Sequence, residues 1–211
     1  ARRIAALVDT LGRGPVTLLG HSYGGGPAAE AAMLYPDRVR HLILVDAALG
    51  LQERPSEAPA PGLAGALLGV RPLRTAVIAT VGTQPLFSEF WLRQFVARQE
   101  VVTPARTDIY RAPFVLQGFS ASLGDWAWQF GAEHGSFASE GPEGYRRLAM
   151  PLTLVWGALD RITPPAQAEA ILALAPRARL VKLAGVGHIP QIENPALFNR
   201  QLSELLVASR P

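Results

Sequence analysis

The sequence around Ser22 constrains the fold of this chain more than any other feature. A short apolar run over residues 16–19 leads directly into the sequence G-H-S-Y-G at residues 20–24, and an Ala-rich segment over residues 27–34 follows it. A buried strand that turns sharply into a helix is the context in which the pattern G-x-S-x-G forms a nucleophile elbow. The pattern therefore predicts a strand, a tight bend at Ser22 and a helix, in that order.

The bend has steric consequences for the residues beside it. We expect Ser22 to take a strained, positive φ, so that its hydroxyl projects at the carboxyl end of the strand. Small residues are then needed two positions away, which accounts for Gly20 and Gly24. The helix N-terminus behind Ser22 supplies positive potential and backbone N–H groups where an oxyanion would form. An idle serine in a Gly-rich turn is the alternative interpretation.

The alternation of strands and helices continues elsewhere in the chain. Apolar runs at residues 41–45, 152–156 and 179–183 predict three further buried strands, and amphipathic or Ala-rich patterns between them predict helices. This alternation is typical of an α/β fold with a mostly parallel sheet and helices on both faces. We expect Thr163 and Asn194 to cap the helices that follow them.

Residues 50–149 interrupt the alternation. A stretch rich in Pro, Glu and Ala comes first, and helical patterns that carry most of the aromatic residues follow. We therefore predict a core formed by residues 1–49 and 150–211, with a helical cap or lid, residues 50–149, inserted between the second and third strands present.

A serine hydroxyl needs a base to become a nucleophile, and the chain offers four histidines. His21 adjoins Ser22 and would point the other way along the elbow. His41 opens a buried strand, and His134 lies in the inserted block. His188 directly follows the last predicted strand, at the sheet edge where the active sites of open α/β sheets collect. We therefore predict that His188 is the base for Ser22.

The base in turn needs a carboxylate that fixes its tautomer. Asp160 follows the strand at residues 152–156, one helix and one strand before His188, so both side chains are expected at the same sheet edge. Asp46 ends the strand at residues 41–45 at that same edge. We favour Asp160, because its longer, Gly-opened loop can reach a histidine, and we interpret Asp46 as a cap or loop brace.

Composition excludes several classes of site. The chain has no Cys, so a disulfide, a thiolate nucleophile and a Cys-ligated metal are impossible. Its formal net charge is +3, and the Arg residues are scattered without the basic stripe that nucleic-acid binding needs. Its most apolar stretch is broken by charged residues and Pro, which argues against a membrane span. No metal site or cofactor is indicated, and a small molecule is the expected partner.

Four stretches carry a resemblance to a known family. The segments G-H-S-Y-G-G, L-I-L-V-D-A, W-G-A-L-D-R-I-T-P and G-V-G-H-I-P-Q-I-E-N-P resemble, in order, the landmarks of α/β-hydrolases with an inserted helical cap. The resemblance covers about residues 1–49 and 150–208. It implies that Ser22 is the nucleophile, His188 the base and Asp160 the acid, with the backbone N–H of Tyr23 as one oxyanion donor. A serine at this position disfavours the dehalogenases and epoxide hydrolases of this fold, which use Asp.

The resemblance and the residues together predict a serine hydrolase. Its expected substrate is a small, mostly apolar ester or related carbonyl compound, cleaved through an acyl-enzyme without a cofactor. An acyltransferase, a C–C bond hydrolase and a cofactor-free haloperoxidase of the same fold are alternatives, as is a non-catalytic ligand-binding protein. We expect His21 and Ile189 beside the triad, with Trp126, Trp128 and Phe130 from the cap, to line the substrate pocket. Each aromatic residue taken alone is more often packing core.

The resemblance also bears on the extent of the chain. The family's sheet normally has eight strands, whereas the sequence predicts four. We expect the first strands, and the loop that donates the second oxyanion N–H, to lie upstream of Ala1 in a protein longer by roughly 60 to 100 residues. No secretory leader is visible, and a cytoplasmic location is expected.

Overall fold

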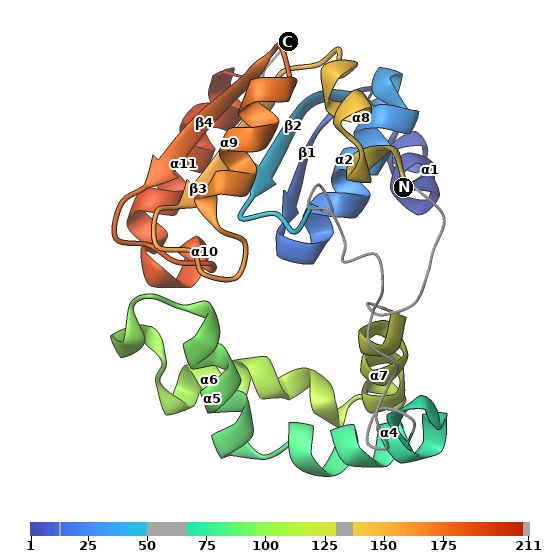
Figure 1. Ribbon diagram of the computed structural model, residues 1–211, viewed down its shortest axis with the longest axis vertical. Helices are drawn as coiled ribbons and strands as arrows, with labels where there is room; N and C mark the ends of the chain where they lie inside the picture. Colours follow the sequence, from blue (N-terminus) through green and yellow to red (C-terminus); the bar gives the residue numbers. More distant parts are fainter. Residues whose placement is uncertain (13, 50–66, 130–136, 209–211) are drawn as a thin grey trace. The chain divides into compact units, whose positions relative to one another are not determined.

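The computed structural model in Figure 1 describes residues 1–12, 14–49, 67–129 and 137–208. The chain forms two compact units. The first consists of Ala1–Glu53, Phe95–Arg98 and Ser136–Pro211, and the second of Arg54–Gln94 and Gln99–Gly135. The short segment Phe95–Arg98 therefore belongs to the first unit although the chain on either side of it belongs to the second. The predicted boundaries at residues 49 and 150 did not anticipate this segment.

The first unit is built on a sheet of four parallel strands. Their order in the sheet is their order in the chain: β1 (Val16–His21), β2 (Val39–Val45), β3 (Leu152–Gly157) and β4 (Ala178–Leu183). The predicted parallel sheet is thus confirmed. Because all the strands run the same way, their carboxyl ends meet at one edge, and the loops that follow them share that edge.

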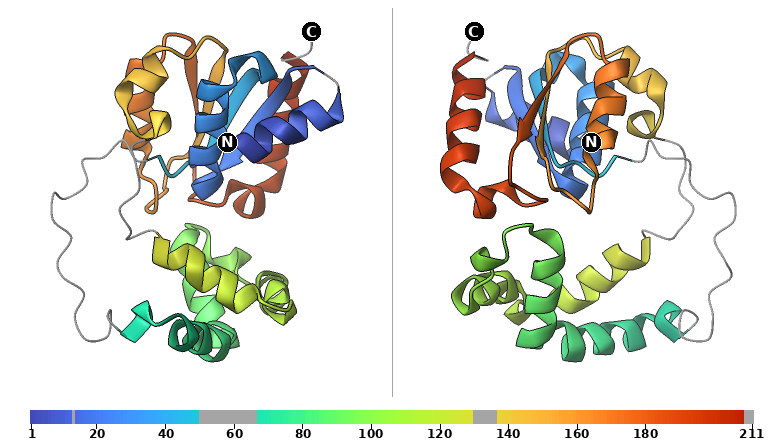
Figure 2. Two further views of the ribbon diagram at one scale, coloured as in Figure 1. Left: turned by 90° about the vertical axis from the view of Figure 1, so that its right-hand side faces the viewer. Right: turned by 60° about the vertical axis from the view of Figure 1, so that its left-hand side comes forward.

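Helices cover both faces of this sheet, as Figure 2 shows. The helices α2 (Gly25–Leu34), α8 (Pro142–Arg146) and α9 (Pro165–Leu174) pack on one face, and α11 (Pro195–Ala208) packs on the other. Two further helices belong to this unit: α1 (Arg2–Leu11) lies against α2, and α10 (Pro190–Glu193) leads into α11.

Alternate residues of the strands enter the two cores. Leu42, Leu44 and Trp156 are buried under α2, α8 and α9, whereas Ile43 and Val155 are buried under α11. A strand buried on both faces carries apolar residues at consecutive positions, because each face must be dry. This is why the apolar runs in the sequence identify the strands.

One of the two predicted helix caps is confirmed. Asn194 caps α11, since its Oδ1 accepts the N–H of Leu197 at 3.1 Å. The prediction for Thr163 is wrong: Pro164 is the residue before α9, no side chain caps that helix, and the Thr163 hydroxyl binds elsewhere. Across the described ranges, no helix combines the length and the hydropathy that crossing a membrane requires.

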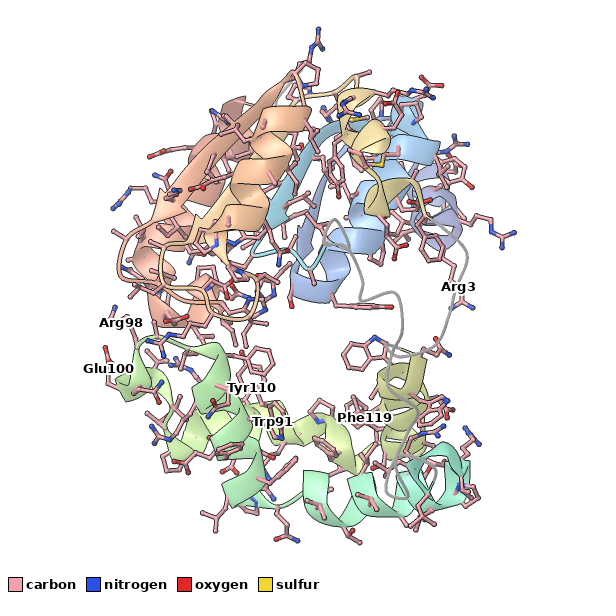
Figure 3. The ribbon with its side chains drawn as sticks, viewed as in Figure 1. Arg3, Trp91, Arg98, Glu100, Tyr110 and Phe119 are labelled. Atoms are coloured by element: carbon pink, nitrogen blue, oxygen red, sulfur yellow. The ribbon has the colours of Figure 1, made fainter. Side chains whose placement is uncertain are left out.

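The described part of the second unit consists of helices joined by short turns. It contains α4 (Arg71–Val77), the π-helical turn Ile78–Gly82, most of α5 (Pro85–Phe95), α6 (Pro104–Arg111) and α7 (Phe119–Gln129). Figure 3 labels Trp91 on α5 and Phe119 on α7. Asp125 on α7 pairs with Arg71 and Arg74 of α4, each at 2.8 Å, and the Arg74 guanidinium lies 5.3 Å from the centre of the Trp128 ring.

Short 3₁₀ turns connect several of these elements. They span Ser22–Gly24, Pro36–Arg38, Gln99–Val101, Ala112–Val115 and Ala138–Glu140. The first of them, which we label η1, links β1 to α2 and carries Ser22.

Candidate active site

Ser22 stands at a sharp bend between β1 and α2. Its φ is 50°, a left-handed value that a residue with a side chain rarely adopts, and it begins η1 (Ser22–Gly24). The Ser22 carbonyl accepts the N–H of Ala48 at 2.8 Å, which fastens the bend to the chain that follows β2. A Cβ on Gly20 would lie 2.5 Å from the carbonyl oxygen of Gly24, so no larger residue fits at Gly20.

The expected steric need at Gly24 is not found. Gly24 has an ordinary helical φ of −62°, and a Cβ built on it meets no described atom within 4 Å. The tight position is the next one, Gly25, where a Cβ would collide with the Cβ of Ala47. The close approach arises because α2 begins at Gly25 and packs directly on the chain leaving β2.

The structure brings Ser22, His188 and Asp160 together. Ser22 Oγ lies 2.8 Å from His188 Nε2, and His188 Nδ1 lies 2.8 Å from Asp160 Oδ2. The side chains of His188 and Asp160 are 1% and 0% exposed, so water does not compete for the bond between them. Ser22 is half-buried. The three residues come from the carboxyl edge of the sheet, after β1, β4 and β3.

The tautomer of His188 follows from its hydrogen-bond partners. An ionised carboxylate only accepts hydrogen bonds, so Nδ1 carries the proton and donates it to Asp160. In the neutral imidazole Nε2 is then an acceptor, and Ser22 Oγ donates to it. This is the tautomer in which a histidine can take a proton from a serine hydroxyl.

Asp160 is held as an ionised acceptor. Its Oδ1 accepts the N–H groups of Ile162 and Thr163 at 2.8 and 3.1 Å, and its Oδ2 accepts the Thr163 hydroxyl at 2.7 Å. Burial alone would raise the pKa of Asp160, but the hydrogen bonds from His188 and Thr163 outweigh it and lower the pKa below its usual value. The carboxylate therefore stays charged and keeps the His188 ring oriented.

Asp46, the rival acid, braces the neighbouring loop instead. It is fully buried at a φ of 41°, and its Oδ1 accepts the N–H of Gly157 at 2.7 Å, just before the Asp160 loop. Burial raises the pKa of Asp46 to about 9, although the Gly157 N–H opposes this, and Asp160 adds to the rise. Asp46 is therefore a neutral acid at pH 7, whereas Asp160 carries the charge beside His188.

His21 points toward the His188 loop, which corrects the expectation that it points away. Its Nε2–H donates to the carbonyl of His188 at 2.8 Å, and the two rings lie 5.3 Å apart. His21, the last residue of β1, and Ser22, which follows it, both contact His188: His21 binds its backbone carbonyl, and Ser22 binds its ring. Burial lowers the pKa of His21, which favours the neutral ring.

The other predicted pocket residues fall into separate places. Ile189 is buried beside His188, and the Tyr23 N–H lies in the first turn behind Ser22. Trp126 and Trp128 are partly exposed residues of α7 in the second unit. Phe130 lies outside the described residues. That these residues line a substrate pocket remains a prediction.

Three residues at this edge were not predicted to be part of the site, although Thr163 was predicted to cap a helix. Thr163 binds Asp160, Phe95 lies with its ring 5.6 Å from the His188 ring, and Glu193 accepts hydrogen bonds from the His188 loop. The available signal was that Thr163 and Glu193 lie close in sequence to Asp160 and His188, within the stretches W-G-A-L-D-R-I-T-P and G-V-G-H-I-P-Q-I-E-N-P that resemble family landmarks. Within the described ranges, no group of three or more His, Asp or Glu is placed to hold a metal ion.

Comparisons with known proteins identify the family of this chain. A family model described as alpha/beta hydrolase fold matches residues 1–195. The 2-hydroxy-6-oxononadienedioate/2-hydroxy-6-oxononatrienedioate hydrolase of Burkholderia vietnamiensis is 27% identical over 206 residues, covering 98% of this chain and 67% of that protein. The pimeloyl-[acyl-carrier protein] methyl ester esterase of Aromatoleum aromaticum is 27% identical over 191 residues, covering 83% of this chain and 68% of that protein.

Solved structures share the fold. A thermophilic esterase from Thermogutta terrifontis superposes with a TM-score of 0.71 at 22% identity, covering 99% of this chain and 71% of that one. The chain thus spans about two thirds of the length of these three proteins.

Proposed function

This chain belongs to the alpha/beta hydrolase fold family, and on that premise we propose that it is a serine hydrolase that uses Ser22, His188 and Asp160. The observation that carries the proposal is the continuous path of hydrogen bonds from Ser22 Oγ through both ring nitrogens of His188 to Asp160 Oδ2, each 2.8 Å long. Relatives named as hydrolases and esterases support it.

The proposed reaction begins with proton transfer. His188 Nε2 takes the hydroxyl proton as Ser22 Oγ attacks a carbonyl carbon, and Asp160 stabilises the imidazolium that forms. The tetrahedral oxyanion sits at the start of η1, where the Tyr23 N–H is one donor. His188 then returns the proton to the leaving group, and a water molecule that it deprotonates releases the acyl group from Ser22.

The proposed substrate is a small, mostly apolar ester or a related carbonyl compound. The rings of Phe95 and His21 flank the His188 ring at 5.6 and 5.3 Å, and the pKa of His21 is lowered so that it presents a neutral ring. Apolar and neutral surfaces around the base favour an uncharged group next to the scissile bond.

The nucleophile is tested with an organophosphonate probe on the full-length protein. Wild type is expected to gain one phosphonyl group on the peptide that contains Ser22, and Ser22→Ala to gain none. Ser203→Ala, which changes an exposed serine of α11, is the matched control and should label like wild type. Labelling that persists in Ser22→Ala would show that Ser22 is not the nucleophile.

A C–C bond hydrolase is the second candidate, and one observation favours it. The relative from Burkholderia vietnamiensis is named for an oxo-dicarboxylate rather than for an ester, and it covers nearly the whole chain. The same Ser22 and His188 would serve, because both reactions begin at a carbonyl group. Rates measured side by side on p-nitrophenyl butyrate and on a 2-hydroxy-6-oxo-dienoate separate the two: the ester proposal predicts faster turnover of p-nitrophenyl butyrate.

A further inference from the structure

Glu193 is a buried carboxylate that the proposed mechanism does not use. It ends α10, is 2% exposed and collects hydrogen bonds from four backbone N–H groups. Its Oε1 accepts from Gly187 at 3.0 Å and from Ile189 at 3.2 Å. Its Oε2 accepts from Ala97 at 2.8 Å and from Arg98 at 3.0 Å. A carboxylate taken out of water is retained at low cost only when its lone pairs are satisfied in this way.

The four donors belong to two segments that are far apart in the sequence. Gly187 and Ile189 flank His188 on either side, while Ala97 and Arg98 belong to Phe95–Arg98, the short piece of the inserted region that joins the first unit. The Arg98 side chain, labelled in Figure 3, adds a further bond from Nη1 to the Glu193 carbonyl at 2.9 Å.

The same segment contacts His188 itself. The His188 N–H donates to the carbonyl of Phe95 at 3.1 Å, and the Phe95 ring lies 5.6 Å from the imidazole. The His188 loop and the segment Phe95–Arg98 pack closely, because a Cβ on Gly187 would come within 2.7 Å of the Ala97 nitrogen and 3.0 Å of Glu193 Oε1. The backbone of His188 is thus fixed on one side by Phe95 and on both flanks by Glu193.

We propose that Glu193 is a positioning residue for His188: its carboxylate fastens Phe95–Arg98 to the His188 loop, and this holds the imidazole at bonding distance from Ser22. The inference rests on the proposed function, since it assigns Glu193 a part in that same site. Under this proposal, Phe95–Arg98 is part of the structure that holds His188, although the chain before and after this segment belongs to the helical insertion.

The main test replaces the carboxylate by an amide. In Glu193→Gln one oxygen becomes an NH₂ group, which faces N–H donors and cannot accept from them. A displacement of His188 of about 1 Å is expected to lower the rate constant for labelling by the organophosphonate about a hundredfold. Glu169→Gln, at an exposed residue paired with Lys182, is the matched control and should label at the wild-type rate.

A spectroscopic readout separates positioning from loss of stability. The Nδ1–H of His188, bonded to buried Asp160, should give a low-field proton resonance. In folded Glu193→Gln this resonance is expected to shift or broaden, whereas a change that only lowers the melting temperature would leave it in place. Because this signal requires no turnover, it tests Glu193 even if wild type proves unable to label, a result that would defeat only the proposed function.

A milder variant covers the case in which Glu193→Gln does not fold. Glu193→Asp keeps the charge but draws the carboxylate back by one methylene group, away from the four N–H groups that it binds, and we expect its labelling rate to fall roughly two- to tenfold. If Glu193→Gln folds and keeps both the wild-type rate and the wild-type resonance, the proposal is overturned. If it does not fold, a wild-type rate and resonance in Glu193→Asp overturn it.

Discussion

Replacing Asp46 by Asn should change how the stability of the protein depends on pH. Asp46 is fully buried, and burial raises its pKa to about 9, far above the value of 3.8 for an unperturbed Asp. Between these two values the folded protein holds a proton on Asp46 that the unfolded chain has released. The contribution of Asp46 to stability is therefore complete below pH 3.8 and is lost as the pH rises toward 9.

The size of the effect follows from proton linkage. A difference of one bound proton changes the free energy of unfolding by about 1.4 kcal/mol per pH unit, so Asp46 alone accounts for a loss of about 3 kcal/mol between pH 6 and pH 8. Asn cannot ionise, and its side-chain oxygen still accepts the N–H of Gly157, which Asp46 bonds at 2.7 Å. The free energy of unfolding of Asp46→Asn relative to wild type should therefore rise by about 3 kcal/mol between pH 6 and pH 8.

Urea unfolding at pH 6, 7 and 8, followed through the fluorescence of buried Trp156, measures this difference. Groups that titrate alike in both proteins cancel in the comparison. Asp37→Asn, at an exposed aspartate, is the control and should run parallel to wild type. If the gap between wild type and Asp46→Asn stays the same at pH 6 and pH 8, the Asp46 carboxyl is not a neutral acid in the folded protein, and the reasoning fails.

Two other predictions concern the elbow and the acid. Gly20→Ala places a Cβ 2.5 Å from a backbone oxygen and should lower the free energy of unfolding by about 1–3 kcal/mol, whereas Gly24→Ala, which meets open space, should change it by less than about 0.5 kcal/mol in the same urea titration. Thr163→Val removes the hydroxyl that bonds Asp160 at 2.7 Å, so the pKa of Asp160 should rise and unfolding should become easier by about 1.5–3 kcal/mol at pH 7. A carboxyl group whose pKa is lowered by folding stabilises the folded protein at pH values above its pKa in the unfolded chain. The deficit of Thr163→Val should therefore shrink as the pH falls below 4, and an equal deficit at pH 3 and pH 7 would contradict the prediction.

The strands and the elbow were predictable from the sequence because their causes are local. A strand covered on both faces must be apolar at consecutive positions, as β2 and β3 are, and Gly20 is required by atoms only four to eight residues away. The same local reasoning failed at Thr163. A threonine before two prolines is typical of a helix cap, but α9 begins at Pro165, one residue later than a Thr163 cap requires, and the Thr163 hydroxyl donates to the Asp160 carboxylate instead.

Glu193 could not have been found in the same way. An acidic residue next to Asn194 and Pro195 is usually an exposed start of a helix, and the sequence gives no sign that the nearby N–H groups of Gly187 and Ile189 bind a buried carboxylate. The donors that bury it include Ala97 and Arg98, which are 96 and 95 residues away. Only the fold brings that segment to the end of β4, so its role follows from tertiary structure.

Beyond the carboxyl ends of the strands, the ladder of sheet hydrogen bonds stops, and the backbone groups there need other partners. Three buried acids supply many of them. Asp46 binds the N–H that ends β3, Asp160 binds its own loop and His188, and Glu193 binds the His188 loop and Phe95–Arg98. Each acid joins one loop to the next, so the position of His188 depends on a series of short polar contacts in addition to the packing of Phe95 beside its ring. Short directional bonds tolerate little displacement, and this is the property that a proton transfer over 2.8 Å demands.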